Sequence, residues 1–356
     1  MIPQREYFDK DIANSDNTSG YYIIEENDFV YNPRKSTDAP YGPISSYKYA
    51  EAGIVSPLYL CFRAKKEINP AFFEWYFRSS AWHRYVYMSG DSGARHDRVS
   101  IKDDTFFAMP INLPSAHEQE HIASFLERID QRIEMQRALV ENLKKYKRGV
   151  TRKLFTQENG SFVTDIQMIS LGDLFPFIRN GFVGTVTPFF TDREHGVRYL
   201  QGTNIHAGKI TDDTVYYVTE DFNAKHSKNI LKRDDILVVQ SGHVGECAVV
   251  GKEYEGANCH ALIIMSNGGN CISDYVAQYI NSEAGNKQIA SITTGNTIRH
   301  ILASAIADMV IPIPSLEEQK RVAHLLSLYD DHIAKEEQLL SELETARKGL
   351  MQQLFI

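Results

Sequence analysis

One segment of this chain occurs twice, 200 residues apart. Residues 109–155 align with residues 309–355 without a gap, and 15 of the 47 aligned positions are identical. An internal repeat at a fixed period means that one structural unit is present twice in the fold. The identical positions include Ser-x-x-Glu-Gln near the start of each copy and Gly-x4-Leu-Phe at its end.

Each copy predicts a long helix. Ser115 with Glu118, and Ser315 with Glu318, match the capping box that satisfies backbone N–H groups in a first helical turn. Apolar residues then recur at alternating spacings of four and three across residues 122–154 and 322–354, with eight of ten seam positions apolar in each copy. This heptad pattern is typical of a coiled coil.

The polar exceptions in the seam predict how the helices pair. They are Gln136, Lys147, Glu336 and Arg347. A parallel pair in register would bury Lys147 against Arg347. An antiparallel pair can place Lys147 opposite Glu336, and Gln136 opposite Arg347, and polar seam residues often specify such a register. We therefore predict an antiparallel coiled coil in this register.

The rest of the chain predicts two globular modules of mixed α and β structure. The modules comprise residues 1–108 and 165–308, with a linker at 156–164 and helical segments at 109–155 and 309–356. Each module combines short β-rich runs with one predicted helix, over 70–88 and 274–291. The expected fold class is α+β: two globular α/β domains separated by two long paired helices.

The two modules differ at their N-terminal ends. Aligning Asp28 with Asp235 leaves residues 165–206 without an upstream counterpart, so the first module is short at its N-terminus. Either the natural start lies further upstream or the chain is a shortened variant, whose first module would then be impaired.

The sequence lacks the marks of several classes of protein. No apolar run is long enough for a membrane span, the start is too polar for a signal peptide, and the four cysteines lack C-x-x-C spacing. We expect a cytoplasmic protein with buried thiols, no membrane association and no resident metal.

Two motifs resemble catalytic signatures. Residues 117–121 read His-Glu-Gln-Glu-His and match the H-E-x-x-H zinc motif, but the second copy replaces both histidines. Residues 69–73 read Asn-Pro-Ala-Phe-Phe, and an Asn cap followed by Pro at the first helical position explains them. No P-loop is present, so we expect no enzymatic activity.

The sequence then resembles a known family in nearly its whole length. The marks are the two Pro-Ser-x-x-Glu-Gln helix starts, an aspartate twelve residues after each glutamate (Asp130, Asp330), and the matching helix ends. The runs DFVYNPRKS, GPIS and GIVSPLYLCF, and LGDLF, YLQGTNI and DDILVVQSGHVGE, add to them. With these features the chain resembles the specificity (S) subunits of type I restriction–modification systems.

That resemblance implies a division of functions. Two target recognition domains each read one half of a split, asymmetric site in double-stranded DNA, and paired helices separate them. Two methyltransferase (M) subunits, which carry S-adenosylmethionine, dock on the S subunit, and restriction (R) subunits join the full complex. The S subunit itself has no catalytic activity and no cofactor.

The charge balance predicts that this chain alone binds DNA weakly. The modules carry 13 basic and 15 acidic residues (net −2) and 11 basic and 16 acidic residues (net −5). DNA affinity rests largely on phosphate neutralisation by Lys and Arg. We therefore expect partner subunits to supply much of the backbone contact, while this chain reads bases.

Candidate base-reading residues are polar loop residues near glycines or in basic loops. Arg, Asn and Gln side chains can bond bidentately to base edges. In the first module the candidates are Asn32, Arg34, Lys35, Ser36, Arg95, His96 and Arg98. In the second they are Gln201, Thr203, Asn204, Gln240, Ser241, His243, Asn296 and Arg299. An ordinary turn or rim role stays open for each of them. The aromatic run over residues 72–85 is interpreted as helix core rather than a stacking platform.

Two alternatives to a specificity subunit stay open. One is a coiled-coil interaction scaffold, or an inactive or truncated specificity variant. The other is a metalloprotease that uses residues 117–121.

Overall fold

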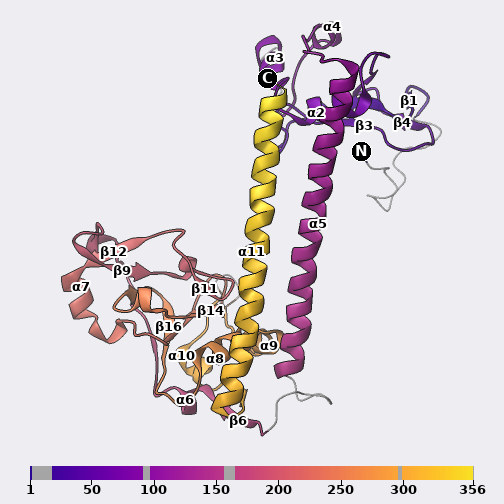
Figure 1. Cartoon of the computed structure of the whole chain (residues 1–356). Coiled ribbons are helices and arrows are strands. Elements are labelled where there is room, and N and C mark those ends of the chain that lie inside the picture. Colours follow the sequence, from indigo (N-terminus) through magenta and orange to yellow (C-terminus); the bar gives the residue numbers. More distant parts are fainter. Residues whose placement is uncertain (2–17, 91–96, 156–164, 296–298, 356) are drawn as a thin grey trace. The chain divides into compact units, whose positions relative to one another are not determined.

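The chain forms two compact units. The computed structural model describes residues 1, 18–90, 97–155, 165–295 and 299–355 (Figure 1). Unit 1 comprises residues 1–138 and 336–356, and unit 2 comprises residues 139–335. Each unit therefore holds one globular module together with part of both long helices. The predicted linker at 156–164 lies outside the described residues.

Unit 1 is built around a small antiparallel sheet of order β3-β2-β5, beside the strand pair β1-β4. Its strands are β1 (Tyr22–Ile24), β2 (Asp28–Tyr31), β3 (Ile44–Ser46), β4 (Gly53–Val55) and β5 (Leu60–Arg63). Its shorter helices are α2 (Pro70–Arg78), α3 (His83–Ser89) and α4 (Asp103–Phe107). Phe29 of β2 is fully buried and packs on Phe62 of β5 and Phe73 of α2. The aromatic run of α2 is thus the core of the module, as predicted.

The helix expected over 70–88 is two helices, α2 and α3. The Asn69 side chain accepts hydrogen bonds from the N–H groups of Ala71 and Phe72 and caps α2, as predicted. At Ser79 the backbone turns extended, and its hydroxyl donates to the Tyr76 carbonyl at 2.6 Å. The helix expected over 274–291 breaks likewise near Ser282, whose hydroxyl caps the second piece. In both modules a hydrogen bond between a serine side chain and the nearby backbone marks the break between the two helices, although the apolar pattern continues.

Unit 2 contains two four-stranded sheets, of order β14-β13-β16-β7 and β15-β9-β12-β8, and the pairs β17-β6 and β10-β11. Its strands are β6 (Gln167–Ser170), β7 (Phe177–Asn180), β8 (Phe190–Thr191), β9 (Gly196–Leu200), β10 (Ile205–His206), β11 (Lys209–Ile210), β12 (Tyr216–Thr219), β13 (Ile236–Val239), β14 (Cys247–Val249), β15 (Asn258–Cys259), β16 (Leu262–Ser266) and β17 (Val310–Ile313). Its shorter α-helices are α6 (Leu171–Leu174), α7 (Glu220–Lys225), α8 (Ser273–Ile280), α9 (Glu283–Ile292) and α10 (Ala303–Ala307). The 3-10 turns are η1 (Thr187–Phe189), η2 (Gly202–Asn204), η3 (Ser227–Asn229) and η4 (Lys252–Tyr254).

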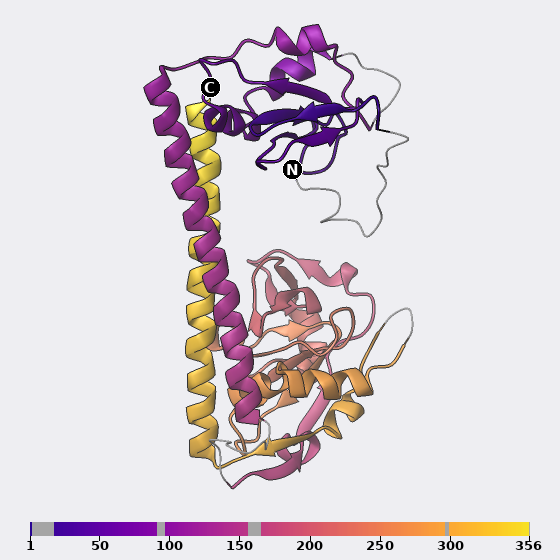
Figure 2. The same ribbon diagram turned by 90° about the vertical axis from the view of Figure 1, so that its right-hand side faces the viewer.

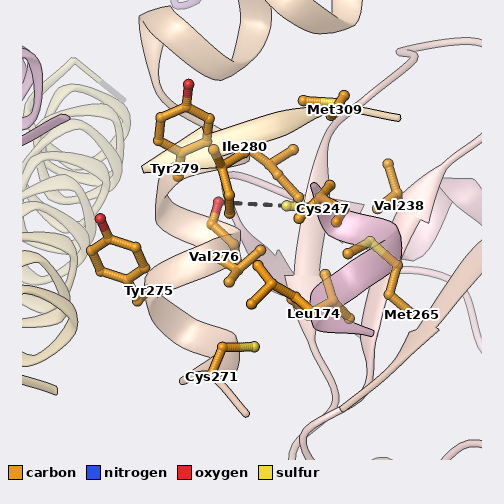
Figure 3. Packing of buried hydrophobic residues seen from close by; sticks show 14 of the residues in the cluster. Leu174, Val238, Cys247, Met265, Cys271, Tyr275, Val276, Tyr279, Ile280 and Met309 are labelled. Carbon is orange, nitrogen blue, oxygen red and sulfur yellow. Dashed lines mark hydrogen bonds between the residues drawn. The ribbon is translucent and has the colours of Figure 1, made fainter. Parts of the chain in front are cut away.

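The core of unit 2 lies between the sheet containing β13 and helix α8. Figure 3 shows Val276 and Ile280 of α8 facing Val238, Cys247 and Met265 of the sheet. The Cys247 thiol donates to the Ala277 carbonyl at 3.5 Å. Burial raises the pKa of Cys259 to about 12 and that of Cys271 to about 11. These three cysteines are therefore buried neutral thiols, while Cys61 is partly exposed.

The long helices α5 (Ala116–Phe155) and α11 (Leu316–Leu354) pair side by side in opposite directions, as predicted (Figures 1 and 2). Both starts are capped as expected, since the N–H groups of Glu118 and Glu318 donate to the hydroxyls of Ser115 and Ser315 at 3.3 Å. All predicted seam positions except Leu354 are buried or half-buried.

The predicted register of the helix pair is wrong. The Gln136 side chain lies against Glu336 rather than Arg347, 11 residues from the predicted partner, and the partner of Lys147 lies 6 residues from the predicted one. Lys147 forms an ion pair with Asp330, and Arg347 forms one with Asp130. This register gives each seam cation an acidic partner, whereas the predicted one would set Arg347 against a neutral amide. Because the seam pattern repeats with every heptad, a shift of one heptad also keeps seam positions opposite one another, so the pattern alone did not select between the two registers.

Equivalent aromatic contacts hold the C-terminal ends of the two long helices, one set in each unit. In unit 1, Phe355 at the end of α11 packs on Phe72 and Tyr76 of α2, with ring centroids 5.4 and 6.0 Å apart. In unit 2, Phe155 at the end of α5 packs on Tyr275 and Tyr279 of α8, at 5.4 and 5.2 Å. Each module is thus held by the C-terminal end of the helix that follows the other module.

The glutamine that both helix starts share hydrogen-bonds to the module that precedes it. Gln119 Oε1 accepts from the Asn69 N–H at 2.8 Å, and Gln319 Oε1 accepts from the Ile272 N–H at 2.9 Å. Both side-chain amides also donate to the carbonyl of the nearby proline, Pro114 or Pro314. The Ser-x-x-Glu-Gln motif therefore caps the helix with its glutamate and anchors the module with its glutamine.

Unit 1 lacks part of this framework among its described residues. In unit 2, β6 pairs with β17, and Ile311 and Ile313 are 0% and 7% exposed. The matching Ile111 is half-buried and Leu113 is 46% exposed, and no described strand pairs with their segment. Within the described part of unit 1, the outer edge of β5 also lacks a strand like β7. The difference agrees with the alignment that left residues 165–206 without a counterpart.

Candidate nucleic-acid interface

In unit 2, two segments that carry predicted reading residues lie together, and the β10–β11 turn lies beside one of them. The Ile301 N–H donates to the Gln240 carbonyl at 3.1 Å, and Ser241 forms an isolated bridge with His300. His300 also exchanges two 2.9 Å backbone bonds with Thr294. The loop between β13 and β14, residues 240–246, therefore lies beside the segment around Thr294 and His300. The rings of His243 and His206 stack with centroids 5.4 Å apart, so the β10–β11 turn also lies beside the β13–β14 loop.

Most predicted residues of this module are accessible at that surface. Thr203, Ser241, His243 and Arg299 are exposed, and Gln201 and Gln240 are half-buried. Gln240 donates to the Ile301 carbonyl at 3.3 Å, so its amide is partly used within the fold. Asn296 lies outside the described residues.

The prediction that Asn204 is available to read a base is wrong. Its side chain is 2% exposed, accepts from the Gln201 N–H and donates to the carbonyls of Thr211 and Thr214. All of these bonds fix the turn after β9, so the amide is not free to contact a base. A polar residue next to a glycine turn can face either inward or outward, and the sequence alone did not show which.

In unit 1, two segments with predicted residues lie together in the same way. The backbones of Arg34 and Arg98 form an isolated antiparallel β-bridge. The Lys35 N–H donates to the Asp97 carbonyl at 2.9 Å, and the Val99 N–H donates to the Pro33 carbonyl at 2.8 Å. Arg34, Lys35 and Ser36 are exposed, while Asn32 and Arg98 are half-buried. Arg95 and His96 lie outside the described residues. Three of the predicted cations, Arg34, Lys35 and Arg98, therefore lie on two neighbouring segments.

The two surfaces occupy equivalent positions in their modules. Asp28 and Asp235 each accept a bond from the N–H three residues earlier, at 2.8 and 3.0 Å, and each follows a residue of positive φ (Asn27, Asp234). The strand that follows this turn, β2 or β13, leads to the bridge Arg34–Arg98 or Ser241–His300. The same turn and strand thus position both loops.

The two turn aspartates differ in their surroundings. Hydrogen bonds from Arg63 lower the pKa of Asp28, whereas burial raises the pKa of Asp235. Asp28 is therefore half of an ion pair at the edge of β5, and the second module has no cation in direct salt-bridge contact with Asp235 among the described residues. The two modules therefore share the backbone turn but differ in the charged partner of its aspartate.

His206 is a residue of this surface that the sequence analysis missed. It is exposed, and its ring lies against His243. The dipeptide Ala207-Gly208 after it, with both residues at positive φ, marks a tight hairpin turn and was the signal that could have identified it.

The motif at residues 117–121 forms the first turn of α5. The Glu118 carboxylate accepts from the N–H and hydroxyl of Ser115 at 2.9 and 2.8 Å, which is the capping role. The rings of His117 and His121 lie 4.1 Å apart, but among the described residues no third ligand joins them.

Comparison with known proteins decides the family. The type I restriction modification DNA specificity domain matches residues 9–157 and 164–345. The chain belongs to this family. The match covers most of both modules, all of α5, and α11 as far as residue 345.

Related proteins carry the same description. The MjaVIII specificity subunit of Methanocaldococcus jannaschii is 27% identical over 267 residues, which cover 69% of this chain and 61% of that protein. The EcoKI specificity subunit of Escherichia coli is 27% identical over 180 residues, which cover 45% of this chain and 37% of that protein. The chain spans 61% of the MjaVIII subunit and 60% of the MjaX specificity subunit of the same organism.

Solved structures show the same fold at low identity. The HsdS subunit of Thermoanaerobacter tengcongensis superposes with a TM-score of 0.51 over 94% of this chain and 81% of that one. The S subunit of a type I system from M. genitalium gives 0.56 over 97% and 87%. Both are 15% identical to this chain. Among the described residues, no helix combines the length and apolarity needed to cross a membrane.

Proposed function

We propose that this chain is the non-catalytic DNA specificity subunit of a type I restriction–modification complex. Each module reads one half of a bipartite, asymmetric site in double-stranded DNA. The paired helices set the separation between the half-sites and dock two M subunits, which bring S-adenosylmethionine. R subunits can join the assembly, and the complex acts in the cytoplasm.

One observation carries the proposal: the anchoring contacts repeat while the loops differ. Phe155 and Phe355, like Gln119 and Gln319, make the same contacts with their respective modules. The loops at equivalent positions carry Arg34 and Lys35 in one module, and Ser241 and His243 in the other. A protein that presents two different reading surfaces on a common framework needs this combination.

The reading surfaces are suited to base contacts more than to backbone attraction. Arg34 and Arg98 of unit 1 can each bond a guanine edge bidentately, and Gln201 or Gln240 of unit 2 can bond an adenine. The net charges of −2 and −5 on the two modules favour a complex in which M subunits neutralise most phosphates.

Genome-wide mapping of methylated bases tests the function. Cells with the gene, without it, and with the gene restored would be compared. We expect a bipartite methylation motif that disappears on deletion and returns on restoration. An unchanged set of methylated sites, with the M subunit present, would favour a scaffold or an inactive variant instead.

Docking of partner subunits has its own test. Native mass spectrometry of the purified complex should give two M subunits for each copy of this chain, because the helix framework repeats. A complex with one M subunit, or none, would contradict the docking part of the proposal while leaving DNA reading open.

A further inference from the structure

Three side chains of unit 2 form a group with metal-binding chemistry. They are His206 at the end of β10, and His243 and Glu246 in the loop between β13 and β14. One ligand atom from each side chain lies within 4.8 Å of the other two. Among the residues that the structure describes, this is the single grouping of three such ligands.

The backbone holds the two loops that carry these side chains. His206 and Lys209 are cross-strand partners in the β10–β11 hairpin, which is closed by Ala207 and Gly208 at φ values of 51° and 77°. The second loop is closed by 2.8 and 2.9 Å bonds between Val239 and residues 245–246. Gly245 is needed there, since its φ is 92° and a Cβ would come within 2.3 Å of the Ile289 side chain.

A carboxylate joins the two loops directly. Glu246 Oε1 accepts a hydrogen bond from the Ala207 N–H, across the gap between the loops. Its other oxygen, Oε2, lies 3.7 Å from His243 Nε2. The main chain therefore holds Glu246 beside His243, with Oε2 facing the imidazole ring.

The histidine rings are also fixed. His206 and His243 stack with an interplanar angle of 17°, and His243 Nε2 lies 3.1 Å from the Ile205 carbonyl oxygen. Histidines that bind metals usually donate one ring N–H to a carbonyl or carboxylate, which sets the tautomer of the other nitrogen. Lys209, the nearest cation on the hairpin, is engaged by Asp331 at 3.2 Å and does not neutralise Glu246.

We propose that His206, His243 and Glu246 bind one divalent transition-metal ion, with zinc as the expected class. Two imidazoles and one carboxylate are the ligand set of many zinc sites that keep a position open for water or another ligand. Calcium and magnesium prefer an all-oxygen set, so the two nitrogens select against them. This proposal departs from the expectation, drawn from the sequence, that the chain has no metal site.

The ion would tie the β10–β11 turn to the β13–β14 loop. It would also place positive charge on a reading surface whose module has a net charge of −5. If the proposed DNA-reading function holds, a coordination position left open by the three side chains would be available to a base nitrogen or a phosphate oxygen. The metal site itself does not depend on that function.

The test is metal binding by the full chain, with zinc alone as the probe. Competition against a coloured chelator gives stoichiometry and affinity, and cobalt substitution gives a visible spectrum that reports nitrogen and oxygen ligands without thiolate. The variants are His206→Ala, His243→Ala and Glu246→Gln, and the last keeps the acceptor for the Ala207 N–H. His324→Ala, an exposed histidine on α11, is the matched control.

We expect one equivalent of zinc for the parent chain and for His324→Ala. Each site variant should lose more than the roughly 10- to 100-fold in affinity that removal of an outer hydrogen-bond partner costs. Glu246→Gln distinguishes loss of the site from misfolding. Its amide oxygen can still accept from the Ala207 N–H, so this variant should unfold at the same temperature as the parent. Absence of stoichiometric binding by the parent, or binding unchanged in His206→Ala and His243→Ala, would overturn the site. Neither result depends on DNA methylation, so it stands apart from a failure of the proposed function.

Discussion

Gln136 lies against Glu336, its own counterpart 200 residues later in the chain. Its side-chain amide donates to the Glu336 carbonyl oxygen at 3.1 Å and to the carboxylate at 2.5 Å. Contact between repeat-equivalent residues places this point near the centre of the pairing between α5 and α11. The ion pairs Lys147–Asp330 and Arg347–Asp130 are then equivalent to each other under the same 200-residue shift.

These ion pairs should be coupled. Lys147 and Asp330 are 21% and 22% exposed, so the pair is partly desolvated, and each single reversal, Lys147→Glu or Asp330→Lys, leaves a repelling pair. We expect each single variant to lose about 1–3 kcal/mol and the double reversal to recover most of that loss. Thermal unfolding of the four chains measures the coupling. Additive losses in the double variant would mean that the observed register is not the one in solution.

Asp130 should make stability depend on pH. Burial acts to raise its pKa, but the hydrogen bonds from Arg347 and Arg78 outweigh burial, so the pKa lies below its usual 3.8. A carboxyl whose pKa is lowered by folding stabilises the fold above about pH 4, and that stabilisation is lost as the pH falls through the lowered value.

The variant Asp130→Asn measures this contribution. It should be less stable than the parent near pH 6, and the difference should shrink steadily below about pH 4. Glu127→Gln, at an exposed carboxylate on the same helix, serves as the control and should show little difference at either pH. A gap between parent and Asp130→Asn that stays constant down to about pH 2 would contradict the ion-pair account.

Gln319 should hold the second module on its helix. The side chain is 1% exposed, and the variant Gln319→Ala leaves the Ile272 N–H and the Pro314 carbonyl without their partners. We expect a loss of about 2–4 kcal/mol, since each buried group left unbonded costs about 1–3 kcal/mol. Amide hydrogen exchange near residue 272 measures the local effect, and Gln338→Ala, at an exposed position of α11, is the control. Unchanged protection in Gln319→Ala would remove the anchoring role.

The isolated chain should bind DNA weakly. Its modules carry net negative charge, and nonspecific affinities at physiological salt are already only about 10⁻⁴ to 10⁻⁶ M for proteins that grip phosphates. Fluorescence anisotropy with a duplex that contains the methylated motif should give a dissociation constant above about 10⁻⁶ M for the chain alone. Addition of the M subunit should tighten binding strongly. Tight, sequence-specific binding by the chain alone would show that it carries its own phosphate contacts.

The repeat, the helix caps and the antiparallel direction could be predicted from the sequence because each depends on local pattern. The register could not, because an apolar seam with spacings of four and three matches itself again after each heptad of seven residues. The residues that decide it, Asp130 and Asp330, lie outside the seam exceptions. They receive further bonds from Arg78 of α2 and Gln278 of α8, which no helix pattern reveals.

The candidate interface was predictable only in part. Arg34, Ser241 and His243 are exposed where a reading surface requires them, whereas Asn204 is used inside the fold. Sequence neighbours do not show which side of a turn faces water. His206 and Glu246 became visible as a group with His243 only when the sheet pairing brought two hairpins together.

The most direct test of the account exchanges one module and maps methylation. Residues 165–308 would be replaced by the corresponding module of a related specificity subunit, with α5 and α11 kept, and the methylated motif of the chimera compared with that of the parent. We predict a motif in which one half-site changes while the other half-site and the spacing are retained. A motif that changes in both halves, or in neither, would contradict the claim that each module reads its own half of the site.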